Sequence, residues 1–241
     1  MSNKKMILGI TFIAIIWFTI IACNKSGDEK SFNNAEELKT YLDEQPVNVS
    51  DKPIKVSMSI NDSMFKSVAD VIKSAGKYVS LKITGNGLTT ILPWFADCTN
   101  LTYIIIPNSV TNIGEFAFYN CKNLTSVNIP NGVTSIGYNA FAGTSLTSVN
   151  IPNSVTSIGR FAFNRCSSLT SVTINGVTSI GSSAFGDCNN LTSVTFKGII
   201  DSSNFQDYSF KGDLINKYLA SGTGTYTTIA PVDLDSIWTK K

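Results

Sequence analysis

From residue 101 to residue 196, the chain repeats one pattern of apolar and polar positions every 22 to 23 residues. Each unit opens with a leucine, and the next residues alternate between apolar and small polar side chains, a period of two that predicts a β-strand. A turn, a second short apolar segment and an Ala-Phe pair complete the unit. A weaker copy of the strand lies at 78–83. Self-similarity at this period predicts a solenoid whose coils bury their apolar sides against each other. The leading leucines are Leu101, Leu124, Leu146, Leu169 and Leu191.

Strand geometry assigns each position of a coil to the inside or the outside. In the coil that begins at Leu124, Val127 and Ile129 point inward while Ser126 and Asn128 point outward. We expect the strands to stack into a parallel sheet about 4.8 Å apart. The coils from Leu124 and Leu169 are one residue short, and their inward positions should stay in register. The phenylalanines that close the coils should form a ladder through the core: Phe118, Phe141, Phe163 and Phe185.

The flanking segments lack the repeat, and their patterns indicate capping structures at the two ends of the solenoid. Residues 34–42 have an Asn cap, early acids and helical spacing of apolar residues, and 54–60 alternate as a strand. A second helix begins at Asn61 or Asp62 and ends at Gly76. Residues 213–220 could form a short helix. Because a solenoid needs its apolar ends covered, we expect an N-terminal cap at 31–77, a repeat array at 78–200 and a C-terminal cap at 201–241. The aromatic residues of the last segment either cover the final coil or bind a ligand.

The first residues carry a targeting pattern. Lys4 and Lys5 precede an apolar run at 6–22, which predicts a secretory signal at 1–22. The junction Ala22-Cys23 resembles the lipobox of bacterial lipoproteins. That resemblance implies an acylated Cys23 as the first mature residue, followed by a lipidated polar tether at 23–30. An uncleaved signal anchor is the alternative, because the run reaches the lower length limit of a membrane-spanning helix.

Composition argues against catalysis. Charged residues make up 15% of the chain, the net charge is +2, and histidine is absent. The commonest general base and the commonest metal ligand are therefore missing. The sequence predicts a protein that is not an enzyme, with no cofactor, no metal, no nucleic acid partner and no small-molecule substrate.

Four cysteines occupy one equivalent position of the repeat, and they are Cys98, Cys121, Cys166 and Cys188. Stacking should line them up along the array in a column interrupted at Gly143, whereas zinc needs four ligands around one centre. Neighbours could lie within the Cα range of a disulfide, but parallel Cβ vectors should hold the sulfurs apart. Buried free thiols are the main prediction, and disulfides are the alternative.

The sequence pattern of the repeat resembles that of a known family. The pattern LTSVxIPxxVTSIGxxAFxxCxx, over 78–196, resembles the BspA-like leucine-rich repeats of surface proteins from spirochaetes and Bacteroides-type bacteria. The resemblance implies a right-handed leucine-rich-repeat solenoid with a parallel β-sheet along one face, little helix in the repeats, a small α+β N-terminal cap and a C-terminal cap. It also implies a surface lipoprotein of the cell envelope, in the outer membrane or at the cell surface. Such a protein would bind a protein ligand such as a host extracellular matrix or serum protein, in adhesion. An envelope scaffold without a host ligand remains the alternative.

The outward positions of the sheet are the predicted partner-binding residues. Most are small and polar, whereas Tyr103 and Ile105 are apolar and of the kind that anchors interfaces. Alternatively, the N-terminal cap folds over this first pair and buries it. The outward pairs are Tyr103 and Ile105, Ser126 and Asn128, Ser148 and Asn150, Ser171 and Thr173, and Ser193 and Thr195.

Overall fold

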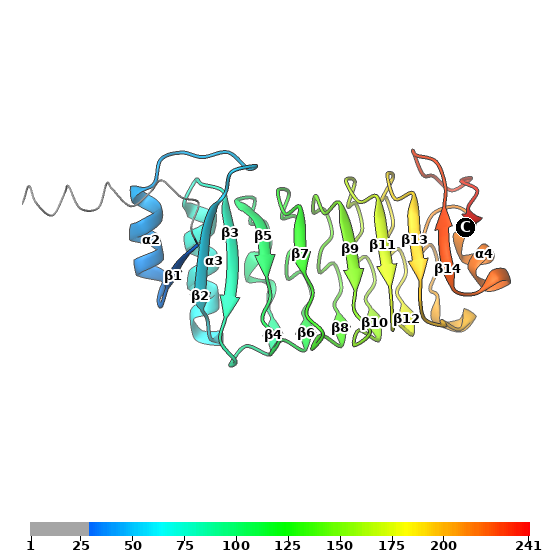
Figure 1. Ribbon diagram of the computed structural model, residues 1–241, viewed down its shortest axis with the longest axis horizontal. Coiled ribbons are helices and arrows are strands. Elements are labelled where there is room, and N and C mark those ends of the chain that lie inside the picture. Colours follow the sequence, from blue (N-terminus) through cyan, green and yellow to red (C-terminus); the bar gives the residue numbers. More distant parts are fainter. Residues whose placement is uncertain (1–28) are drawn as a thin grey trace, which may run out of the picture.

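The computed structural model describes residues 29–241. The predicted signal at 1–22, Cys23 and most of the tether at 23–30 lie outside the described residues. Figure 1 shows an elongated solenoid whose coils stack side by side between two flanking segments. Among the described residues, no helix has the length and apolar character needed to cross a membrane.

Each coil has three sides. The long strands lie on the front, in the parallel order β1-β2-β3-β5-β7 and then β9-β11-β13. Two-residue strands form a second sheet, in the order β12-β10-β8-β6-β4. The third side consists of turns that also exchange hydrogen bonds between coils, such as Phe118 N to Ala140 O at 2.7 Å. The front strands are β1 (Lys30–Phe32), β2 (Ile54–Ser59), β3 (Val79–Thr84), β5 (Leu101–Ile105), β7 (Ser126–Asn128), β9 (Ser148–Ile151), β11 (Ser171–Ile174) and β13 (Ser193–Phe196). The second sheet contains β4 (Thr90–Ile91), β6 (Asn112–Ile113), β8 (Ser135–Ile136), β10 (Ser157–Ile158) and β12 (Ser179–Ile180).

The predicted phenylalanine ladder is confirmed, and it is longer than expected. Its rings stack with interplanar angles of 3–13°. Phe95 extends it at one end and Phe210 at the other, so the repeat geometry continues past residue 200. The centroid distances are 5.9 Å for Phe95–Phe118, 5.2 Å for Phe118–Phe141, 5.2 Å for Phe141–Phe163, 5.1 Å for Phe163–Phe185 and 4.7 Å for Phe185–Phe210.

The front of the solenoid is not one continuous sheet. Its ladder stops between β7 and β9, where, among the described residues, the one backbone hydrogen bond on this side of the two coils runs from Thr147 N to Thr125 O, at 3.3 Å. The coil from Leu124 lacks one residue just before Leu146, so the chain enters β9 by a shorter turn than it enters the other strands. The coil from Leu169 lacks its residue after the strand, and the pairing of β11 with β13 is intact. A deletion before a strand therefore disturbs the ladder, and a deletion after it does not.

At the N-terminal end, two helices replace the second sheet. Both are where the sequence predicts them, α2 (Ala35–Glu44) and α3 (Asp62–Ser74). The Asn34 side chain accepts a hydrogen bond from Glu37 N, and Asn61 accepts one from Met64 N. The α3 side chain Phe65 packs edge-on against Phe95, with 5.1 Å between ring centroids. Strand β1 escaped prediction because it has three residues, of which only Phe32 is buried.

At the C-terminal end, the parallel order changes to antiparallel. Strand β14 (Gly224–Thr227) pairs antiparallel with β13, and β15 (Thr239–Lys240) pairs with β14. The predicted helix is α4 (Leu214–Ser221). Trp238 is buried and donates its Nε1–H to Lys211 O at 3.1 Å. Tyr218 and Tyr226 are also buried against Phe196, so these aromatic side chains cover the last coil.

Candidate protein-binding face

The outer face of the front sheet places the apolar pair beside the cap strands. Tyr103 lies between Ser80 and Ser126 in the ladder, and Ile105 lies between Lys82 and Asn128. Both side chains are half-buried. Strands β1 to β3 continue the sheet edge to edge (Figure 1) instead of folding across this face. The alternative in which the cap buries both side chains is therefore wrong.

From β7 onward, the outward positions of β7, β9 and β11 are small, polar and uncharged. Ser126, Asn128, Ser148 and Asn150 are exposed, while Ser171 and Thr173 are half-buried. Thr195 is beside β14, and its Oγ1 is 2.9 Å from Thr225 Oγ1. Such side chains offer hydroxyl and amide hydrogen bonds to a partner, but no base or nucleophile with a positioned acid partner. Within residues 29–241, no group of three or more His, Cys, Asp or Glu side chains could hold a metal ion.

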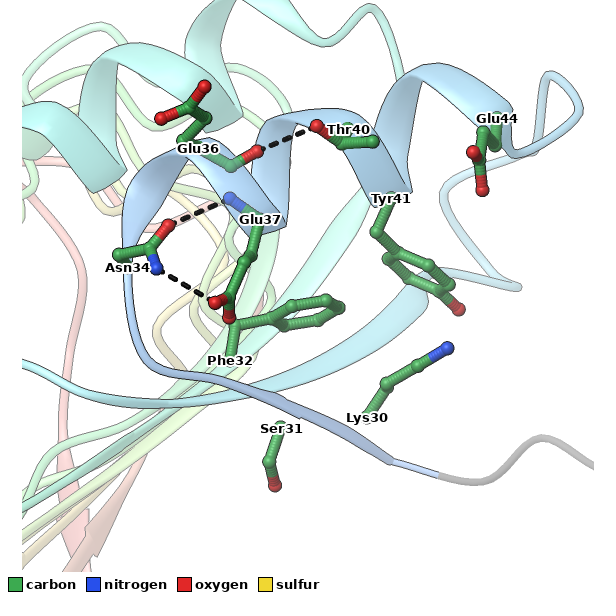
Figure 2. A pocket seen from close by; sticks show the side chains of 9 residues that line it. All are labelled: Lys30, Ser31, Phe32, Asn34, Glu36, Glu37, Thr40, Tyr41 and Glu44. Atoms are coloured by element: carbon green, nitrogen blue, oxygen red, sulfur yellow. Dashed lines mark hydrogen bonds between the residues drawn. The ribbon is translucent and has the colours of Figure 1, made fainter.

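A pocket of about 590 Å³ opens between β1 and α2 (Figure 2). The Lys30 ammonium lies 4.9 Å from the Tyr41 ring centroid. Asn34 and Glu37 are engaged in capping α2, with Asn34 Nδ2 donating to Glu37 Oε1 at 2.9 Å. Thr40 Oγ1 donates to Glu36 O at 3.0 Å. The Lys30 ammonium thus already contacts the Tyr41 ring. Asn34, Glu37 and Thr40 use their polar groups in hydrogen bonds that cap or stabilise α2. Sequence reasoning missed this pocket because one of its walls is the unpredicted β1.

The four thiols are free, buried and aligned, as the main prediction stated. Each of the last three donates its S–H to a phenylalanine carbonyl of the preceding coil. One expectation needs correction, because the column has no gap at Gly143. Thr144 takes the cysteine position, and its Oγ1 is 3.2 Å from Cys166 Sγ. The Sγ–O distances are 3.0 Å for Cys121 to Phe95, 3.2 Å for Cys166 to Phe141 and 3.1 Å for Cys188 to Phe163.

These thiols should resist alkylation in the folded protein. Burial raises the pKa of Cys98 to about 11, so its reactive thiolate is scarce at pH 8. Iodoacetamide at pH 8 should leave all four unmodified in the native chain and modify all four in urea, as peptide mass spectrometry would show. Ser167→Cys, at an exposed position next to Cys166, is the control that should react in the native state. Intact masses lower by about two hydrogens per pair without reductant would show disulfides and contradict the prediction.

The comparisons with known proteins agree on the repeat. A family model described as a BspA type leucine rich repeat region matches residues 93–216 in six copies. The match extends beyond residue 200, in line with the place of Phe210 in the phenylalanine ladder. No curated protein matches the chain.

Solved structures resemble parts of the chain. A leucine-rich repeat protein of T. pallidum, known from a crystal structure, has 26% sequence identity to this chain and a TM-score of 0.54. The alignment covers 73% of this chain and 79% of that protein. A leucine-rich cell surface protein of Faecalibacterium prausnitzii is 34% identical with a TM-score of 0.48, covering 52% of this chain and 33% of that one. A leucine-rich repeat protein of Bacteroides ovatus is 30% identical with a TM-score of 0.40, covering 52% and 38%. The chain therefore spans about a third of the Faecalibacterium protein and 38% of the Bacteroides protein.

Proposed function

Starting from the fact that this chain belongs to the BspA-type leucine-rich repeat family, we propose that it is a lipid-anchored bacterial surface protein that binds a protein partner in adhesion. The front sheet is the proposed binding face. The observation that carries the proposal is the uncovered outer face itself, where one apolar pair, Tyr103 and Ile105, borders a run of small polar side chains. Interfaces of this kind combine a few aromatic or aliphatic anchors with a surrounding area of weaker polar contacts.

A topology assay on intact cells tests the location and the partner together. External protease should remove the protein from intact cells, and the full chain should capture a protein from host extracellular matrix. A periplasmic lipoprotein of the same strain serves as the control for cell integrity. Protection from protease together with no capture would contradict the proposal and favour an envelope scaffold instead.

The anchor predicts a labelling result at Cys23. The apolar run at 6–22 ends in Ala22-Cys23 and a polar segment follows, the arrangement from which we propose acylation. Cells fed with labelled palmitate should incorporate the label into the wild-type protein and not into Cys23→Ser. Equal labelling of both proteins would disprove lipidation at this position.

Replacing the apolar pair Tyr103 and Ile105 is expected to weaken partner binding without lowering the stability of the fold. The double change Tyr103→Ser and Ile105→Ser makes this part of the sheet resemble the other coils. It should weaken partner binding by about 2 kcal/mol or more, while the melting temperature stays nearly constant because both side chains lie on the outer face of the sheet and their removal leaves no cavity in the core. Ser148→Ala with Asn150→Ala, on the same face, is the control and should change affinity little. Unchanged affinity in a stable Tyr103/Ile105 variant would place the binding site elsewhere.

A further inference from the structure

A second surface, on the third side of the coils, carries a row of aromatic rings that are at least partly exposed and that the front-sheet proposal does not use. We call it the aromatic ridge; it consists of Phe116, Tyr119, Tyr138 and Phe161. The Phe116 centroid is 5.6 Å from that of Tyr119 and 5.1 Å from that of Tyr138, which in turn is 6.0 Å from Phe161. All four side chains are exposed or half-buried. The Arg160 guanidinium lies 4.5 Å from the Phe161 centroid and extends the ridge.

Two of the rings occupy a backbone conformation that disfavours them. Phe116 and Phe161 have φ of 56° and 58°, in the left-handed region. The equivalent residues of the neighbouring coils are Asn139 and Ser183, with φ of 52° and 53°. Asn tolerates this region, whereas a bulky residue there is an outlier, and such outliers cluster at functional sites. The core does not require these rings, because the phenylalanine two residues later in each coil fills it.

Four polar side chains along the ridge are free of hydrogen bonds and ion pairs within the described residues. In the described part of the chain, the hydroxyls of Tyr119 and Tyr138 make no hydrogen bond, and the exposed Glu115 and Arg160 make no ion pair. Glu115, Tyr138 and Arg160 occupy the same position in three successive coils. An acid and a base therefore stand two coils apart, with two unengaged phenolic donors between and beside them.

We propose that the aromatic ridge binds a proline-rich segment in the polyproline II conformation, lying along the solenoid axis. Polyproline II repeats every three residues with a rise of about 3.1 Å per residue, so residues i and i+3 are about 9.3 Å apart. Two coils span about 9.6 Å at the usual strand spacing. Residues i and i+3 would therefore meet equivalent positions two coils apart, such as Phe116 and Phe161.

Charge complementarity defines the ligand further. A basic residue at i would face Glu115, and an acidic residue at i+3 would face Arg160. Polyproline II carbonyls are not hydrogen-bonded internally, so the free tyrosine hydroxyls can donate to them. Aromatic-lined grooves recognise proline-rich segments in this way because the ligand is already ordered before it binds.

Fluorescence anisotropy with labelled peptides tests the proposal on the full chain. The probe is PPRPPEPP, and the control peptide GSRGSEGS keeps the charges without the prolines. The protein should bind the probe at least about tenfold more tightly than the control peptide. Phe116→Asn with Phe161→Asn should weaken probe binding at least about tenfold while keeping or raising the melting temperature, because Asn suits the left-handed region. Ser183→Asn, at the same backbone position in the next coil, should leave affinity unchanged.

Several results would overturn the proposal. They are no binding of the probe, equal binding of both peptides, or unchanged affinity in a folded double variant. If the double variant does not fold, Tyr138→Ser carries the test, because Ser182 already occupies the equivalent position. Binding of cellohexaose instead of the probe, lost in the same variants, would identify a sugar platform and would also contradict the proposal. None of these outcomes depends on Tyr103 or Ile105, so this site and the front face fail independently.

Discussion

Phe163→Ala is expected to lower the free energy of unfolding by about 3–5 kcal/mol, the usual cost of truncating a buried phenylalanine. The Phe163 ring is completely buried and stacks on both neighbours, with centroids 5.2 Å from Phe141 and 5.1 Å from Phe185. The hydrogen-bonded coils on either side cannot collapse onto the cavity without breaking their ladders. Urea unfolding followed by circular dichroism measures the loss.

Phe161→Ala is the matched control for this prediction. It removes the same side chain two residues earlier, from a half-buried surface position. Its cost should be clearly smaller, about 1–2 kcal/mol, because part of the ring already contacts water and its removal leaves no closed cavity in the core. Similar losses in the two variants would show that the phenylalanine ladder is not the main source of stability in this part of the solenoid.

Gly159→Ala is expected to cost about 3 kcal/mol, the upper part of the range for overpacked sites. A Cβ at this position would lie 2.7 Å from the Gly137 carbonyl carbon and 2.9 Å from Tyr138 N, both of them backbone atoms of the preceding coil. A flexible side chain could move aside, but a backbone fixed by interstrand hydrogen bonds cannot. The coils would have to separate, which lengthens the Gly159 N to Ile136 O bond of 2.8 Å.

The control for the glycine prediction is Gly87→Ala, in the loop between β3 and β4, where the added Cβ meets no atom within 4 Å. This change should be neutral or slightly stabilising, because it reduces the freedom of the unfolded chain. Thermal unfolding of the two variants side by side provides the measurement. A similar fall in melting temperature for both would refute steric contact between coils as the cause.

The repeat itself could be predicted because each coil packs against neighbours of nearly the same sequence. Alternation decides which side chains point inward, and identical spacing then stacks the same residues, as for Phe141 and Phe163. Where the copies differ, prediction was weaker. The pattern predicts a gap at Gly143, but Thr144 fills the cysteine position there. Threonine and cysteine have similar sizes, yet a search for the repeated cysteine does not find a threonine. Strands β14 and β15 escaped because two- and four-residue strands show no clear period.

The surfaces were harder to predict than the core. Tyr103 and Ile105 stand out in sequence as apolar residues at outward positions, but their uncovered state follows from how the cap strands join the sheet. The aromatic ridge was missed for another reason. Phe116 and Phe161 directly precede the Ala-Phe pair and read as further core residues, and only their left-handed backbone conformation turns their rings outward.

The gap between β7 and β9 determines how the molecule would respond to a pulling force. Elsewhere on the front, load along the axis is shared among several interstrand hydrogen bonds per coil, whereas in this gap the strands are joined by a single backbone hydrogen bond of 3.3 Å among the described residues. The second sheet continues across it through the pairing of β8 with β10. Under tension between the two ends, the front would therefore open first between these coils, and the molecule would bend backward around the second sheet before any coil unfolds. In a single-molecule stretching experiment, this gives a compliant first extension that precedes rupture.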